Sequence, residues 1–228
     1  MNIGQETLET MSFAKWYNNW LFSLMKRHLG KEVLEVGAGI GNFTDLLAGN
    51  YEITAIDVNE KYIDHLKKKF AKKIKAGFGD IEMGEYFFNN KKFDAVVCLN
   101  VLEHIEYDSR ALKNMYELLK PSGKLILLVP AHKALYSDFD KELGHFRRYA
   151  RSEIEEKLLG VGFERMELKF LNWWAAIGWF VFLKLGKKNT LPKKEVSVFD
   201  KIGKLFLFPE KFISPPFGLS IFAVYEKK

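Results

Sequence analysis

The chain has 228 residues, a length that predicts one domain, or one domain with a substantial insertion, rather than two full-size domains. Hydrophobic residues make up 48% of it and charged residues 28%, which excludes a disordered or low-complexity chain. The formal net charge of +6 is too diffuse to require nucleic acid, and a single cysteine excludes an internal disulfide framework.

Apolar residues at helical spacing predict an amphipathic helix over residues 13–28, near the N-terminus. A short apolar run at 32–36 then predicts a strand, the glycine-rich segment 37–41 a turn, and residues 43–47 the start of a helix. The same unit recurs as a strand at 51–56 and a helix at about 60–73, and a weaker strand follows at 75–78. Repetition of this unit is typical of an α/β fold.

The second half of the chain continues the alternation. It predicts a buried strand at 93–99, a helix at 109–119, a strand at 124–129, a helix from about 152 and strands at 164–170 and 219–225. Such alternation favours a parallel sheet covered by helices on both faces. We expect a single domain, residues 1–228, made of an N-terminal helical cap (1–30), a cofactor-binding core (31–170), a helical insertion (171–217) and a last strand (218–228).

The insertion combines an aromatic run at 171–185 with four lysines between residues 187 and 194. As a helix, residues 170–185 would extend about 24 Å, which is too short to span a bilayer. The pattern leaves several hypotheses open. In the first two hypotheses the segment lies in a membrane interface, or it forms an apolar acceptor pocket that includes Trp173. In the other two it packs as a buried helix, or it forms a homodimer interface through residues 170–217.

Three glycines between the first strand and the next helix, in Glu35-Val-Gly-Ala-Gly-Ile-Gly41, allow the backbone to turn sharply and to approach a ligand. Their spacing is G-x-G-x-G, whereas a hydride-transferring dinucleotide enzyme has G-x-G-x-x-G. An acidic residue, Asp57, ends the second strand, and Gly79-Asp80 follows the third. These features together are far more specific than a glycine-rich turn alone.

With these motifs, the chain resembles the class I S-adenosylmethionine-dependent methyltransferases over residues 31–170 and in its last strand. The resemblance implies a Rossmann-like, doubly wound sheet of seven mostly parallel strands, the last antiparallel, that binds ligands at the carboxyl ends of the strands. It implies S-adenosylmethionine as cofactor and S-adenosylhomocysteine as product. The cofactor-binding residues that it implies are Glu35, Gly37, Ala38, Gly39, Gly41, Asp57, Val58, Asp80, Ile81, Asn100 and, from the N-terminal helix, Tyr17.

Two histidine-containing segments are candidates for the chemistry. His104 follows the fourth strand and acts either as a general base or only as a loop-positioning residue. The segment His145-Phe-Arg147-Arg148-Tyr149 is similar to a motif of a small-molecule, type 11/12-like subgroup of these methyltransferases. His145 and Tyr149 are candidates to steer a proton. The candidate acceptor-binding residues are Arg147, Arg148, His132 and Trp173, unless an arginine only pairs with Asp138 or Asp140 to fix the loop.

From these features we expect methyl transfer to a small-molecule or lipid-like acceptor, with oxygen as the receiving atom. The alternatives are an RNA methyltransferase and a cofactor-binding scaffold without turnover. Nucleic acid is disfavoured because Asn100 is followed by Val101-Leu102 rather than by the Pro-Pro of amino-group methylases. The histidines are dispersed, so no metal site is expected. No leader is evident, so we expect a cytoplasmic protein, with peripheral contact at the inner membrane face as a further hypothesis.

Overall fold

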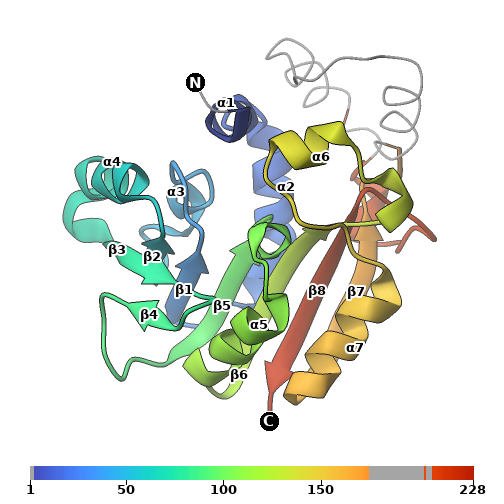
Figure 1. Cartoon of the computed structure of the whole chain (residues 1–228). Coiled ribbons are helices and arrows are strands. Elements are labelled where there is room, and N and C mark those ends of the chain that lie inside the picture. The colour runs from blue at the N-terminus through green and yellow to red at the C-terminus, as the bar shows by residue number, and fades with distance from the viewer. Residues whose placement is uncertain (1–2, 175–202, 204–206) are drawn as a thin grey trace.

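One eight-stranded sheet forms the centre of the computed structural model, which describes residues 3–174, 203 and 207–228 (Figure 1). The strand order is β4-β3-β2-β1-β5-β6-β8-β7. β1, β2, β3, β5 and β6 pair in parallel, whereas β8 runs antiparallel to both of its neighbours. The strands are β1 (Glu32–Val36), β2 (Glu52–Asp57), β3 (Lys75–Asp80), β4 (Glu85–Tyr86), β5 (Phe93–Leu99), β6 (Leu119–Pro130), β7 (Phe163–Leu171) and β8 (Ser220–Lys227).

This architecture confirms the predicted doubly wound α/β fold and the antiparallel last strand. The predicted number of strands was seven, and the structure has eight. The extra strand is β4, which has two residues and pairs antiparallel with the end of β3. A two-residue strand is too short to show the alternation of apolar and polar residues by which strands are predicted.

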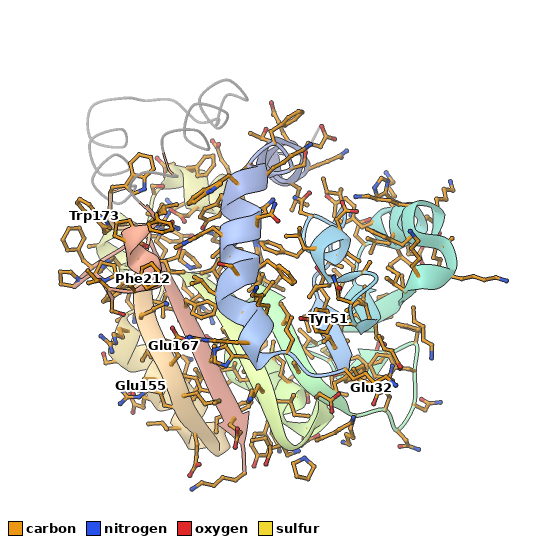
Figure 2. All side chains as sticks on the ribbon, turned by 180° about the vertical axis from the view of Figure 1, so that it is seen from behind. Glu32, Tyr51, Glu155, Glu167, Trp173 and Phe212 are labelled. Atoms are coloured by element: carbon orange, nitrogen blue, oxygen red, sulfur yellow. The ribbon has the colours of Figure 1, made fainter. Side chains whose placement is uncertain are left out.

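Helices cover both faces of the sheet, and each face has its own core. The helices are α1 (Ile3–Met11), α2 (Lys15–Met25), α3 (Thr44–Leu47), α4 (Glu60–Phe70), α5 (Asp108–Leu118), α6 (Asp138–Glu142) and α7 (Arg151–Val161). α5 and α7 pack on one face (Figure 1). α2 and α4 pack on the other, and Figure 2 shows α2 in blue across that face. Strands such as β1 are therefore apolar on both sides.

The N-terminal cap differs in part from its prediction. The helix expected at 13–28 is present as α2 and the short helix η1 (Lys26–His28). A second helix, α1, precedes it, and a turn at Ser12 and Phe13 joins the two. The sequence did not predict α1, because its residues are largely polar. Three further short helices, η2 (Ala71–Lys73), η3 (Leu102–His104) and η4 (Lys133–Leu135), lie in connections.

Most of the predicted insertion, residues 175–202 and 204–206, lies outside the described residues. The described part beyond it contains the short helix η5 (Pro209–Lys211), which leads into β8. The Glu210 carboxylate accepts hydrogen bonds from the backbone amides of Asn172 and Trp173, at 2.8 and 2.9 Å. The segment that returns to β8 is thereby fastened to the end of β7. None of the helices in the described ranges is both long and apolar enough to span a bilayer.

Candidate active site

A cleft of about 820 Å³ opens at the carboxyl ends of β1, β2, β3 and β5. The strand order reverses between β1 and β5, which is the place where open α/β sheets bind their ligands. Residues of α1 and α2, including Leu8 and Tyr17, close one side of the cleft. The volume falls in the range of small-molecule sites.

The glycine turn after β1 forms the floor of this cleft. Gly37 and Gly39 have φ angles of +66° and +53°, which favour glycine strongly. A Cβ atom on Gly37 would lie only 2.5 Å from a methyl group of Val101. Glycine is therefore required at position 37 both by the backbone conformation and by the close contact with Val101.

Five acidic residues line the cleft, and three of them, Glu35, Asp57 and Asp80, were predicted to bind the cofactor. Glu35 is 5% exposed, and its Oε2 accepts a hydrogen bond from the Thr44 hydroxyl at 2.6 Å. Burial, together with the nearby negative charges of Asp57 and Asp45, raises the pKa of Glu35 to about 7. A ligand ammonium group would relieve this burial of negative charge, so the site fits the amino group of the implied cofactor.

Asp57 and Asp80 are held in place by backbone amides. Asp57 accepts hydrogen bonds from the amides of Gly39 and Asn59, both at 2.8 Å, and burial raises its pKa. Asp80 accepts from the amides of Glu82 and Met83 at 2.9 and 3.0 Å. Each carboxylate has about four acceptor positions, so both can still accept from a ligand. Fixed acceptors of this kind fit the ribose hydroxyls and the adenine amino group.

The structure brings nearly all of the predicted cofactor residues to the cleft. The lining includes Glu35, Gly37, Ala38, Gly39, Asp57, Val58, Asp80, Ile81, Asn100 and Tyr17. Tyr17 also accepts a hydrogen bond from Asn172 Nδ2 at 2.8 Å, and its burial raises its pKa to about 12. Gly41 does not line the cleft, because it packs against Leu66 and Phe70 of α4. Its predicted contact with the cofactor is therefore not supported.

The predicted catalytic histidines meet at the far end of the cleft. His104 lies in η3, directly after β5, and His145 follows α6. Their rings are 4.6 Å apart, edge to face. Burial and the adjacent His145 lower the pKa of His104 to about 4, so its imidazole is neutral at pH 7. His104, His145 and Arg148 all line the cleft.

Arg148 and His145 share one buried carboxylate. Asp140 accepts from Arg148 Nε at 2.8 Å, and His145 Nδ1 lies 2.9 Å from the same oxygen. Burial by itself would raise the pKa of Asp140, but the bonds from His145 and Arg148 hold it below its usual value. The predicted alternative, in which an arginine pairs with Asp140 and fixes the loop, is thus present at Arg148.

Besides Gly41, four predicted residues do not line the cleft. Tyr149 is fully buried and donates to Asp108 Oδ2 at 3.0 Å, which conflicts with its predicted role in steering a proton. Arg147 pairs with Asp108 at 3.0 Å and donates to the Glu106 carbonyl at 2.8 Å, so its charged group is engaged outside the cleft. His132 stacks on Phe170 at 5.1 Å, and Trp173 binds Glu210 through its backbone amide. The predicted acceptor contacts of these last three residues are therefore not supported.

Glu103 was not among the site residues predicted from the sequence. Its side chain is 1% exposed and lines the cleft beside His104, and its Oε2 has no hydrogen-bond partner among the described residues. Burial raises the pKa of Glu103 to about 8. The available signal was an acidic residue within the apolar run Val101 to Ile105, where an ionisable side chain is costly unless it has a function.

Comparison with known proteins agrees with this site. A family model described as a methyltransferase domain matches residues 34–127. A ubiquinone biosynthesis O-methyltransferase of Coxiella burnetii is 36% identical over 100 residues, which cover 42% of this chain and 42% of that protein. The protein of the same name from Rickettsia bellii is 28% identical over 204 residues, covering 76% of this chain and 83% of its own length. The chain thus matches less than half the length of the Coxiella relative.

Solved structures share the fold across nearly the whole chain. A methyltransferase of Archaeoglobus fulgidus that depends on S-adenosylmethionine covers 97% of this chain and 99% of its own, with a TM-score of 0.66 and 21% identity. The N-methyltransferase NodS of Bradyrhizobium japonicum, in complex with S-adenosylhomocysteine, covers 92% and 84%, with a TM-score of 0.58 and 18% identity. Residues 34–127 thus match a methyltransferase domain, and the fold of the chain is the one shared by these S-adenosylmethionine-dependent methyltransferases.

Proposed function

We propose that this protein transfers a methyl group from S-adenosylmethionine to an oxygen atom of a small molecule. The observation that supports this most directly is the cleft at the strand switch point, where the glycine turn, Glu35, Asp57 and Asp80 meet the histidines. The family match and the O-methyltransferase relatives agree with it.

The cofactor supplies, when bound, a methyl group on a positively charged sulfur. In this proposal Glu35 would accept a hydrogen bond from its amino group, Asp57 from the ribose hydroxyls and Asp80 from the adenine amino group. The residues of α1 and α2 that line the cleft would shield the cofactor from water. Holding donor and acceptor in line in this way contributes roughly 7 to 11 kcal/mol to lowering the barrier.

An acceptor hydroxyl must also lose its proton. The groups at the cleft that can take part are the neutral imidazole of His104, the imidazole of His145 and the buried carboxylate of Glu103. We infer that they form the acceptor end of the site. Replacement of His104 by asparagine is then expected to lower turnover far more than cofactor affinity.

We further propose that the small molecule that accepts the methyl group is lipid-like, for example a quinone-like compound. It is supported by an exposed apolar surface at the end of the sheet, which consists of Phe208, Phe212, Ile213 and Phe217, exposed by 40–74%. Figure 2 shows Phe212 and Trp173 at the end of the sheet where β7 meets β8. Contact with a membrane surface or with a second copy of the chain through this region would cover these side chains.

The first test is incubation with methyl-labelled S-adenosylmethionine and a cell extract, followed by partition between organic solvent and water. Label in the organic phase supports the lipid-like acceptor, and label in an aqueous small molecule supports a polar one.

Asp57→Ala is expected to weaken cofactor binding by 10- to 150-fold, which corresponds to roughly 1.5–3 kcal/mol for hydrogen bonds to a charged group. Asp64→Asn, on the exposed side of α4, is the matched control. Cofactor binding without any labelled product would favour the scaffold alternative.

A further inference from the structure

Glu103, His104 and His145 form a cluster with the composition of a metal site. One ligand atom from each side chain can be chosen so that the three lie within 4.8 Å of one another. They are the one such group of three found in the part of the chain that the structure describes. Two of them come from the turn η3 and the third from the loop after α6, so the fold brings together residues 41 positions apart in the sequence.

Both imidazoles have one ring nitrogen directed at a protein oxygen. His145 Nδ1 lies 2.9 Å from Asp140 Oδ1, and the Nδ1 side of His104 faces the backbone of Gly144, whose carbonyl interacts with the ring. The contact with the Asp140 carboxylate favours the His145 tautomer that carries its proton on Nδ1, and this leaves Nε2 of His145 as the ligand nitrogen. A carboxylate behind a ligating histidine is the usual support of metal sites.

Glu103 supplies a second and independent indication. A buried carboxylate normally finds a partner, because leaving it unpaired costs several kcal/mol. Its Oε2 has none among the described residues, although the side chain is 1% exposed and faces the two histidines. Asp140 carries a like charge, and Arg148, which pairs with Asp140 at 2.8 Å, offsets the burial of Glu103 only in part.

We propose that Glu103, His104 and His145 bind one divalent transition-metal ion, of which Zn²⁺ suits the ligands best. Two histidines and one glutamate are a known ligand set of catalytic zinc, in which a fourth position stays open for water or substrate. All three side chains line the cleft, so that position faces the acceptor end of the site. Ligands bonded to tetrahedral zinc at about 2.1 Å lie roughly 3.4 Å apart, so the loaded site is tighter than the present arrangement.

The ion would give the cluster a definite role, which rests on the proposed function. An acceptor hydroxyl bound to the open position would have a lowered pKa, as metal-bound water does. Its proton leaves to solvent, the oxygen forms the new bond to the methyl carbon, and the bond from that carbon to sulfur breaks. The products are the methyl ether, S-adenosylhomocysteine and one released proton. Metal binding itself does not depend on this role.

The test uses the full-length protein, stripped with a chelator and titrated with Co²⁺ alone. We expect one equivalent to bind and to give visible absorption bands of a four- or five-coordinate nitrogen–oxygen site, and Zn²⁺ to displace it. His104→Ala, His145→Ala and Glu103→Gln are each expected to abolish the bands. His65→Ala, which removes an exposed histidine on α4, should leave them unchanged. Asp140→Asn should keep the bands but weaken binding by 10- to 100-fold.

Circular dichroism of each variant separates loss of a ligand from loss of the fold. If the stripped, folded protein binds no Co²⁺, or if His104→Ala and His145→Ala bind it as the parent does, the metal site does not exist. Calorimetric titration of the stripped protein with S-adenosylmethionine tests the proposed function separately. Cofactor binding with no metal site would overturn this inference alone, and a metal site without cofactor binding would overturn only the methyltransferase proposal.

Discussion

At the scale of single residues, Glu35 shows how a binding group is held at a cost to stability. Its carboxylate is buried, its nearest charges are negative, and its pKa is raised from 4.5 to about 7. Between these two values the unfolded chain is ionised while the folded chain still holds the proton. The free energy of unfolding therefore falls as the pH rises through this window.

Glu35→Gln is therefore expected to stabilise the protein without its cofactor. The rise of the Glu35 pKa from 4.5 to about 7 corresponds to a gain of about 3 kcal/mol at pH 8, which vanishes near pH 4. Cofactor affinity should fall by tenfold or more, because the carboxylate is lost. Urea unfolding at pH 4, 6 and 8, together with calorimetric titration, measures both effects. A variant that is less stable than the parent at pH 8 would contradict this account.

At the scale of elements, a buried carboxylate joins two helices and the loop before the second. Asp108, the first residue of α5, is 3% exposed and receives Lys157 of α7 at 2.8 Å, Tyr149 at 3.0 Å and Arg147 at 3.0 Å. Burial alone would raise the pKa of Asp108, but its bonds with Lys157 and Arg147 hold it below 3.8. This contribution to stability is thus present at neutral pH and is lost as the pH falls through the lowered pKa.

Removal of this carboxylate should destabilise the protein by about 3 kcal/mol, because it leaves two half-buried cations and the buried Tyr149 hydroxyl without their shared partner. Asp108→Ala is the variant and unfolding by urea at pH 7 the measurement. Its stability should also depend less on pH below 4 than that of the parent. Arg147→Ala, whose side chain is one-quarter exposed, should cost less and should leave the acceptor KM unchanged. A raised KM for an acidic acceptor would return Arg147 to the binding site.

The glycine turn after β1 could be predicted from the sequence in position and in role, whereas the segment His145 to Tyr149 could be predicted only in position. Four cofactor-site residues could be predicted because each lies at or directly after the carboxyl end of a parallel strand, and local sequence patterns show where such strands end. They are Gly37, Gly39, Asp57 and Asp80. The roles within His145 to Tyr149 did not follow, since adjacent residues point to different sides of the loop. Arg148 faces the cleft whereas Tyr149 binds Asp108, 41 positions away. Glu103 was also not predicted, because the residues that give it a role, His145 and Arg148, lie about 40 positions later in the chain.

At the scale of the whole molecule, the last strand joins the sheet in its interior. β8 lies between β6 and β7, antiparallel to both, and its side chains from Ile221 to Tyr225 are at most 1% exposed. They contribute to the cores on both faces of the sheet. β7 has no other strand partner in the described sheet. Completion of the fold therefore depends on the C-terminal residues.

A chain that ends at residue 218 should consequently fail to fold. Loss of β8 exposes two sheet edges and removes five fully buried side chains, each of which contributes about 1.5–3 kcal/mol where it is large and apolar. For the four large side chains the sum is about 6–12 kcal/mol, which is comparable to the usual 5–15 kcal/mol of stability of a whole domain. Circular dichroism and size-exclusion chromatography of the truncated chain measure the effect. Deletion of Lys228 alone, an exposed residue that pairs with Glu164, is the matched control and should unfold at the parent's temperature. Cooperative thermal unfolding of the truncated chain would show that residues before 219 form a stable domain by themselves, and that β8 is an addition to the sheet rather than part of its core.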